Sequence, residues 1–104
     1  NDTLRGWYDA LSTAEKRKLR RWLKQQGCTR GNAVERMTQL VLQSCAEYAI
    51  LPAQDVMELT NAARMNTPGT VGSPNWEWRL TGFDSVEACL RRLRPLILRR
   101  AEEE

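Results

Sequence analysis

The chain has 104 residues, which corresponds to one domain or less. Its 16 basic and 13 acidic residues give a net charge of +3, a weak bias that argues against a nucleic-acid module. No hydrophobic run approaches the ~18 residues that cross a membrane, and the polar N-terminus does not resemble a signal peptide.

The three cysteines are far apart and the chain contains no His. This argues against zinc and excludes a Ser-His or Cys-His nucleophile within the chain. Free thiols are typical of a reducing cytosol. We therefore expect a cytoplasmic protein with no cofactor, no metal, no nucleic-acid partner and no membrane contact.

The first expected helix covers residues 2–11, with Asn1 or Asp2 as its cap. Its apolar face comprises Leu4, Trp7, Tyr8 and Leu11, which are spaced i, i+3, i+4 and i+7.

A second helix begins at a capping box formed by Ser12 and Glu15 and stops near Gly27. Its outer surface is strongly basic. That surface is either an anion-binding face or an ordinary solvated helix face, and the second interpretation is the default for a surface helix. The basic residues are Lys16, Arg17, Lys18, Arg20, Arg21 and Lys24.

The third expected helix, residues 32–48, has the strongest apolar stripe. The apolar run at residues 49–51, closed by Pro52, predicts a short buried strand. Residues 53–59 could form one or two helical turns. The stripe of the third helix comprises Val34, Met37, Leu40, Val41, Leu42, Cys45 and Tyr48.

The last expected helix begins at Asp84, with Glu87 three residues later as a cap signature. Pro95 lies inside it and is expected to kink or divide it. Residues 102–104 form an acidic tail that should fray. The apolar stripe is Val86, Leu90, Leu93, Leu96 and Ile97.

Residues 64–80 have no helical or strand period in their first two thirds, and positions 68–74 contain two Pro and two Gly. Such a composition predicts an ordered, irregular loop. Loops of this length are more often functional than idle. The alternative is a connector pinned by two buried aromatics, Trp76 and Trp78.

Two segments carry a family resemblance. The motif Arg-Met-Asn-Thr-Pro-Gly-Thr at residues 64–70, followed by Asn-Trp-Glu-Trp-Arg-Leu at 75–80, resembles the C-terminal signature of 4-α-glucanotransferases. This is the amylomaltase or disproportionating-enzyme family, glycoside hydrolase family 77. Asn-Asp-Thr-Leu-Arg-Gly-Trp-Tyr at residues 1–8 looks like the family segment just after a Thr-His-Asp motif, and Ala-Ile-Leu-Pro-Ala-Gln-Asp at 49–55 fits the spacing.

The resemblance covers nearly the whole chain and implies a fold. We expect a mainly α chain of four helices, one short strand and a long ordered loop. Residues 1–104 would form a single partial domain, the C-terminal portion of a (β/α)8 TIM-type barrel. The lone strand has no partner within the chain. We therefore expect exposed apolar surface and self-association, with the Ile50 strand pairing with a copy of itself.

The resemblance also implies the chemistry. The family transfers α-1,4-glucan segments between maltodextrins by a retaining mechanism with two carboxylates, supported by a third. All three would lie upstream of Asn1, so this chain would contain no catalytic residue and would be inactive without the remainder of the enzyme. The six carboxylates considered as an alternative pair are expected to be helix caps or surface groups. They are Asp2, Asp9, Asp55, Glu58, Glu77 and Asp84.

The expected contribution of this segment is barrel helices and an acceptor-side substrate loop that contacts an α-1,4-glucan. The resemblance implies that Asn66 hydrogen-bonds sugar and that Pro68 and Gly69 hold the loop in shape. Trp76 and Trp78 could stack on glucose or pack in the core, and their alternation with charges favours the core. Trp76 is kept as a candidate contact, while the role of the loop tip at residues 71–74 stays open.

A free-standing helical interaction module is the second hypothesis for the whole chain. It would explain the basic helix faces, but it gives no reason for a rigid Pro-Gly loop that ends in Trp-x-Trp-Arg. A Thr-His-Asp sequence directly before Asn1 in the gene would favour the transferase.

Overall fold

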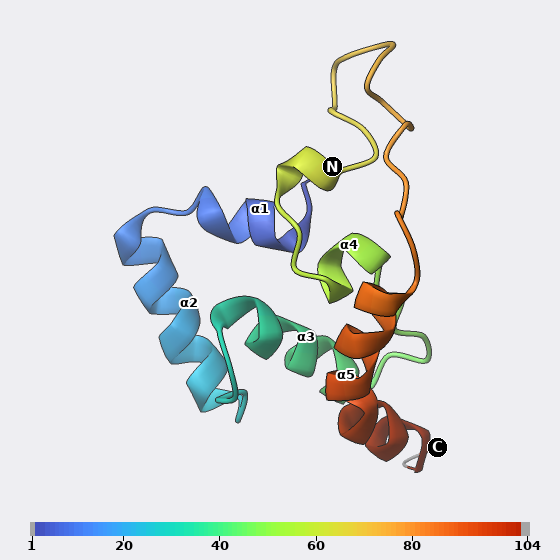
Figure 1. The fold of residues 1–104 in the computed structure, drawn as a ribbon. Coiled ribbons are helices and arrows are strands. Elements are labelled where there is room, and N and C mark those ends of the chain that lie inside the picture. The colour runs from blue at the N-terminus through green and yellow to red at the C-terminus, as the bar shows by residue number, and fades with distance from the viewer. Residues whose placement is uncertain (1, 103–104) are drawn as a thin grey trace.

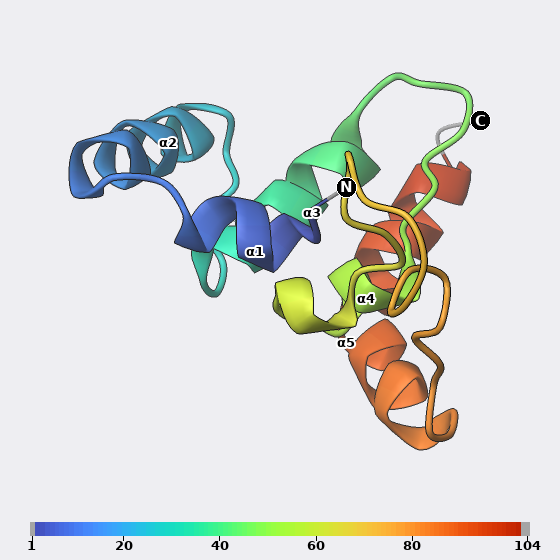
Figure 2. The same ribbon diagram turned by 90° about the horizontal axis from the view of Figure 1, so that it is seen from above.

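The computed structural model describes residues 2–102, which form an open arrangement of helices with one projecting loop (Figure 1). Its principal extents are 42 × 35 × 24 Å. The elements are α1 (Leu4–Asp9), α2 (Thr13–Gln25), α3 (Ala33–Gln43), α4 (Ala53–Val56), the 3-10 helix η1 (Asn61–Ala63) and α5 (Asp84–Glu102). In Figure 2, α2 and α5 lie at opposite ends of the molecule with α1 and α3 between them.

Side-chain caps explain where the first three helices begin. Ser12 and Glu15 form the predicted capping box of α2, and Asn32 forms a second box at α3. At α1 the cap is Thr3, whose hydroxyl accepts a hydrogen bond from the Gly6 amide. The prediction of Asp2 as the cap is therefore wrong, and the other candidate, Asn1, lies outside the described residues.

The hydrophobic core is formed by α1, α2 and α3. Leu23 and Cys28 are completely buried in it, and Leu4, Leu11, Leu19 and Leu40 pack around its edge. Most basic residues of α2 are exposed, as expected for a solvated face. Two of them contact Tyr8: Arg20 donates to its hydroxyl (2.9 Å), and Lys16 lies 5.3 Å from the centre of its ring. The buried core residues are Tyr8, Leu23, Cys28, Ala33, Val34 and Met37.

The third helix ends earlier than its sequence pattern predicts. It stops at Gln43, because Ser44 is extended and its hydroxyl donates to the Val41 carbonyl. Arg100 of α5 donates to the carbonyls of Leu42 (3.1 Å), Ser44 (2.7 Å) and Ala46. A distant side chain thus satisfies carbonyl groups at the end of α3 in place of a further helical turn.

The predicted strand at residues 49–51 is not formed, and residues 2–102 contain no strand at all. The fold-class prediction was wrong on this point. A strand needs a neighbour for its backbone hydrogen bonds, and nothing in the described chain offers one. Ile50 is 86% exposed and lies in an irregular segment. The five α-helices remain compatible with a helical fragment of a barrel.

The last helix packs only lightly on the rest. It contacts α3 and α4 but has no buried residue, and it runs through Pro95 without being divided. Leu90 and Ile97 of its predicted stripe are exposed, whereas Val86, Leu93 and Leu96 are half-buried. No helix within residues 2–102 is both long and apolar enough to cross a membrane.

Candidate functional site

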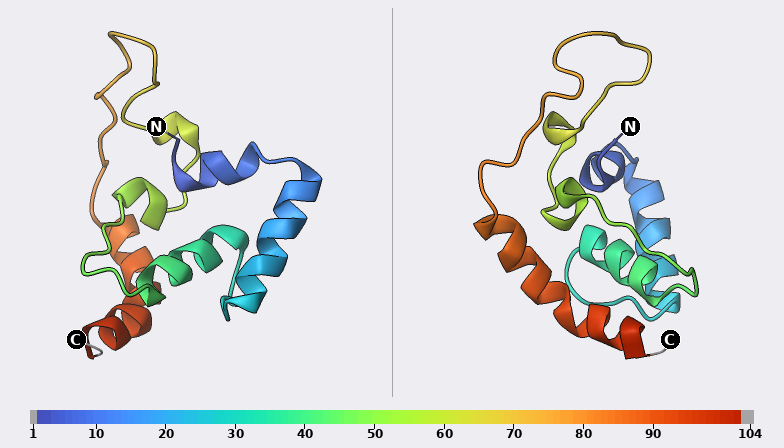
Figure 3. Two further views of the ribbon diagram at one scale, coloured as in Figure 1. Left: turned by 180° about the vertical axis from the view of Figure 1, so that it is seen from behind. Right: turned by 90° about the vertical axis from the view of Figure 1, so that its right-hand side faces the viewer.

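Residues 64–80 form an ordered loop that stands away from the helices in both views of Figure 3. Asn75 braces it from within: its Oδ1 accepts from the Thr67 amide (2.8 Å), and its Nδ2 donates to the Thr70 hydroxyl (3.1 Å). The Trp76 amide donates to the Met65 carbonyl and closes the base of the loop. The prediction of an irregular loop, without helix or strand, is confirmed.

The Pro-Gly pair makes a tight turn within this loop. The Thr70 amide donates to the Thr67 carbonyl at 3.2 Å, and Gly69 between them has φ +82. Pro followed by a residue with positive φ is the pattern of a type II turn, in which glycine is strongly favoured. Pro68 and Gly69 are both exposed at this turn.

Asn66 lies at the root of the loop, half-buried. It lines two adjacent cavities together with Arg64. The first, here called the loop cavity, has a volume of about 370 Å³, within the usual range for small-molecule sites. Its lining residues are Asn61, Ala62, Arg64, Asn66, Thr67, Pro74, Asn75, Glu77 and Trp78.

The second cavity, here called the root cavity, is smaller, at about 170 Å³. It lies between the loop, the start of α1 and the α4 segment. Its lining residues are Asp2, Thr3, Pro52, Gln54, Asp55, Arg64, Met65 and Asn66.

The two tryptophans differ in their surroundings. Trp76 is 71% exposed, so core packing is wrong for this residue. Its φ of +64 is uncommon for a bulky residue. Trp78 is half-buried and lines the loop cavity.

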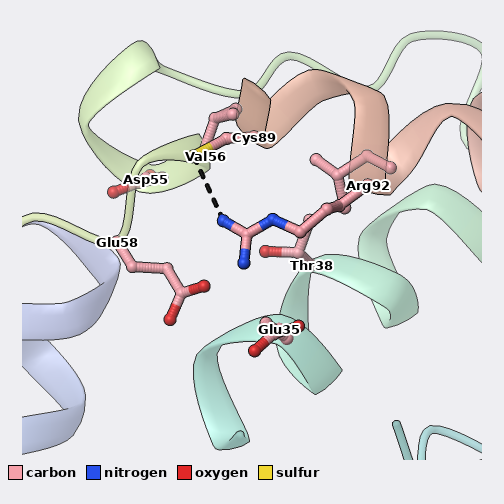
Figure 4. Close-up of a pocket in the computed structure, with 8 residues that line it drawn as sticks. Glu35, Thr38, Asp55, Val56, Glu58, Cys89 and Arg92 are labelled. Carbon is pink, nitrogen blue, oxygen red and sulfur yellow. Dashed lines mark hydrogen bonds between the residues drawn. The ribbon is translucent and has the colours of Figure 1, made fainter. Parts of the chain in front are cut away.

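A third cavity lies between α3, α4 and α5 (Figure 4). Its volume of about 20 Å³ has room for a single water, which excludes a sugar ring. The guanidinium of Arg92 enters it and donates to the Cys89 sulfur at 3.2 Å. Two acids on its rim already have partners, because Glu58 accepts from Asn32 (2.7 Å) and Glu35 belongs to the α3 capping box.

The carboxylates considered as an alternative catalytic pair each have a structural position. Among the residues that the structure describes, there is no group of three or more His, Cys, Asp or Glu side chains suited to a metal ion. Asp2 pairs with Arg64 (3.0 Å), Asp9 pairs with Arg5 (3.2 Å), Asp55 accepts from the Leu4 amide (2.8 Å), Glu77 accepts from the Ser73 hydroxyl (2.5 Å), Glu58 is bonded to Asn32 as above, and Asp84 lies in the first turn of α5.

The structure also joins the start of α1 to the segment before the loop, which the sequence did not predict. Asn61 Oδ1 accepts from the Thr3 amide (2.9 Å), and Asn61 Nδ2 donates to Asp2 Oδ1 (3.1 Å). The Thr3 hydroxyl donates to the Leu59 carbonyl (2.7 Å). With the bonds of Asp2 to Arg64 and of Asp55 to Leu4, these contacts form what we call the α1 clamp, which comprises Asp2, Thr3, Asp55, Asn61 and Arg64.

Gly6 makes the clamp possible. A Cβ atom at this position would lie 2.1 Å from Asn61 Oδ1 and 2.2 Å from its Cγ, closer than non-bonded atoms approach. Thr3, three residues before Gly6, is a recognisable cap signal. Asn61 gives no such signal, because its partners are 58 and 59 residues away in the sequence.

Comparison with known proteins shows one consistent family. A family model described as 4-alpha-glucanotransferase matches residues 1–85. The chain is 43% identical over 101 residues to a chloroplastic/amyloplastic 4-alpha-glucanotransferase of Arabidopsis thaliana, a match that covers 93% of this chain and 17% of that protein.

Two further relatives carry the same name. A potato protein, also chloroplastic/amyloplastic, is 36% identical over 103 residues, which is 93% of this chain and 17% of the relative. A Thermus thermophilus protein is 41% identical over 83 residues, which is 77% of this chain and 16% of the relative. The chain thus spans about one sixth of the length of these relatives.

Proposed function

The chain belongs to the 4-alpha-glucanotransferase family, and on that premise we propose that it works as part of an enzyme that moves α-1,4-glucan segments between maltodextrins. Its own contribution is a loop that contacts the acceptor sugar, with Asn66 as the main polar contact. The nucleophile and the acid/base are supplied by chain outside these 104 residues.

The observation that carries this proposal is the loop cavity beside Asn66. Sugars are recognised by hydrogen bonds to hydroxyl groups and by apolar contact with the faces of the ring, so a suitable site combines amide or carboxylate groups with an aromatic wall. The loop cavity has both: Asn66, Asn75 and Glu77 supply the amide and carboxylate groups, and Trp78 supplies the aromatic wall. Another cavity of similar volume, about 340 Å³, lies between residues 27–43 and α5; its lining includes the amides of Gln39 and Gln43 but no aromatic side chain.

Trp76 supports the same interpretation from the backbone. A bulky residue with positive φ stores conformational strain, and such outliers cluster at ligand-binding sites. Trp76 combines a φ of +64 with high exposure. We propose that it offers its ring to the glucan, while Pro68 and Gly69 fix the turn beside it.

The positions of the carboxylates support the proposal that the catalytic carboxylates lie in another part of a longer polypeptide. A retaining mechanism needs two carboxyl groups about 5 Å apart across the glycosidic bond. Those of this chain act as caps and ion-pair partners, as described above. We therefore expect no oligosaccharides longer than the substrate when the purified 104-residue chain is mixed with maltotriose.

The test uses the full-length polypeptide. Transfer breaks one glycosidic bond and forms another, so the number of reducing ends is conserved, whereas hydrolysis adds one. The wild-type protein should convert maltotriose into longer and shorter oligomers with little gain in reducing ends. Asn66→Ala should lower the rate by about tenfold or more, by the loss of an interaction to the sugar.

A matched control is Gln25→Ala, which removes an exposed amide on α2 remote from the loop. It should leave the rate unchanged. A wild-type protein with no transfer activity, or an Asn66→Ala variant as active as wild type, would refute the proposal.

Exposed apolar side chains indicate that this chain is covered by a partner. Leu90, Ile97 and Leu98 on α5 are each about two-fifths to half exposed, and contiguous apolar patches of this kind mark interfaces. We propose that the remainder of the polypeptide covers them. Sedimentation of the isolated chain tests this: association of copies, as the exposed apolar surface predicts, supports it, and a clean monomer counts against it.

A further inference from the structure

The α1 clamp reaches the substrate loop at one residue, Arg64. The hydrogen bonds that shape the loop itself are local, such as those from Thr67 to Asn75 and from Trp76 to Met65. Arg64, by contrast, crosses from the root of the loop to the chain before α1 and binds Asp2 at 3.0 Å. The ion pair therefore joins the two segments that form opposite walls of the root cavity.

This connection lies two residues from the proposed sugar contact. Arg64 and Asn66 line both the loop cavity and the root cavity. Because Arg64 lies two residues before Asn66, a shift of the Arg64 backbone shifts the backbone of Asn66 as well. The Arg64 side chain is 27% exposed, so it is held against protein along most of its length.

The other end of the connection is held by several hydrogen bonds. Asp2 Oδ1 accepts two hydrogen bonds, one from Arg64 and one from Asn61 Nδ2. Asn61 is in turn bonded to the Thr3 amide and packed against Gly6. The anchor for the loop is therefore the capped N-terminus of α1, which belongs to the hydrophobic core.

On these contacts, and resting on the proposed function, we propose that Asp2 and Arg64 are positioning residues for the transfer reaction. Their ion pair fixes the register of Asn66 against the start of α1, so that the acceptor sugar is held in place of water. Loss of the pair leaves the protein folded but loosens the acceptor. Water then competes better with the sugar hydroxyl for the same glycosyl group.

The readout is the share of hydrolysis among all cleavage events, measured from the gain in reducing ends as described above. This ratio is a property of the folded, active molecules, so partial unfolding of a variant does not change it. The ion pair lies at the surface, with the Asp2 side chain 43% exposed. Single pairs of this kind contribute little to folding stability, so the variants are expected to fold.

Four variants of the full-length polypeptide are compared with wild type. Asp2→Asn keeps an oxygen for Asn61 but removes the charge, Arg64→Gln removes the cation, and the third variant combines both. Each single variant should raise the hydrolysis share by roughly tenfold, since small misplacements of a reacting group have large effects on rate. The double variant should have the same hydrolysis share as the single variants, because each single change already removes the same interaction. Arg64→Lys, which keeps the cation, should have a hydrolysis share much closer to that of wild type.

The matched control is Arg5→Gln, which breaks the ion pair of Arg5 with Asp9 on α1 itself (3.2 Å, side chains 42% and 46% exposed, against 27% and 43% for Arg64 and Asp2). It should leave the hydrolysis share unchanged. The inference is overturned if the Asp2 and Arg64 variants stay within about twofold of wild type, or if Arg5→Gln has the same effect as they do.

The experiment also separates this inference from the proposed function. If the wild-type protein transfers glucan and Asn66→Ala impairs transfer while the Asp2 and Arg64 variants match wild type, only the positioning inference fails. If the wild-type protein does not transfer glucan, the proposed function fails and the inference fails with it.

Discussion

Replacement of Gly6 by Ala tests the α1 clamp directly, because two effects of this change have opposite signs. In an ordinary helix, Gly→Ala stabilises by about 1 kcal/mol. Gly6 lies inside α1, yet its added Cβ would fall 2.1 Å from Asn61 Oδ1. The Asn61 side chain cannot simply swing away, because it bonds both Thr3 and Asp2.

The magnitude follows from what Asn61 would lose. Moving it sacrifices the exposed hydrogen bond to Asp2, worth about 1 kcal/mol, and leaves the buried Thr3 amide without an acceptor, which costs about 1–3 kcal/mol with its own lost bond included. Thr3 is only 4% exposed, so water cannot fully replace the lost bond. After the helix-propensity gain, we expect Gly6→Ala to destabilise α1 locally by about 1–3 kcal/mol.

Hydrogen exchange measured by mass spectrometry is the appropriate assay, because it reports local opening within the full-length polypeptide. A peptide covering residues 2–11 should exchange about tenfold to a hundredfold faster in Gly6→Ala than in wild type, while a peptide from α5 should not change. Gly6→Ala combined with Asn61→Ala should cost less than the sum of the two single changes, since the clash is gone. Slower exchange of α1 in Gly6→Ala would refute the reasoning, because an unobstructed helix glycine behaves in that way.

Three further predictions concern the caps, the junction of α3 with α5, and the thiols. Arg100→Ala should raise exchange at residues 42–46 by about tenfold, because hydrogen bonds from a charged donor to their carbonyls are lost. Burial raises the pKa of the Cys28 thiol, so iodoacetamide should alkylate exposed Cys45 much faster than Cys28 at pH 8, as read by mass spectrometry. Hydrogen bonds from the Ser12 backbone and hydroxyl lower the pKa of Glu15. The ionised Glu15 therefore stabilises α2 above the ordinary Glu pKa, and this stabilisation is lost as pH falls through the lowered pKa. An NMR titration of Glu15 should give a midpoint below that of the unfolded chain, and Ser12→Ala should raise that midpoint.

Each of these predictions has a control. Arg99→Ala removes the exposed neighbour of Arg100 on the same helix and should leave residues 42–46 protected. In urea the difference in thiol reactivity should disappear, since it arises from burial. If Glu15 titrates in folded protein at the unfolded value, the capping box is not formed in solution.

Local sequence signals predicted the helices and the loop well. The capping box of Ser12 with Glu15 was predicted because its bonds span three residues. The box of Asn32 with Glu35 has the same spacing but was not predicted. The Pro68-Gly69 turn follows from the φ preferences of those two residues. The family resemblance likewise rests on contiguous motifs at each side of the chain, and the comparisons confirm it.

The remaining predictions were wrong because the features they concern depend on contacts between distant parts of the chain. The strand at residues 49–51 has the right composition, but a strand exists only with a partner, and the described chain provides none. The end of α3 is decided by Arg100, which lies 56 residues beyond Ser44. Trp76 alternates with charges as a half-buried residue would, yet the backbone of the loop turns it outward.

The sequence by itself determined the start of α2, the Pro-Gly turn and the family, because each depends on residues within a few positions of one another. Only the tertiary structure decided that Asn61 and Arg64 hold the start of α1, because their partners are some sixty residues away in the chain. Backbone preferences act locally, whereas hydrogen bonds between distant segments exist only after the chain has folded.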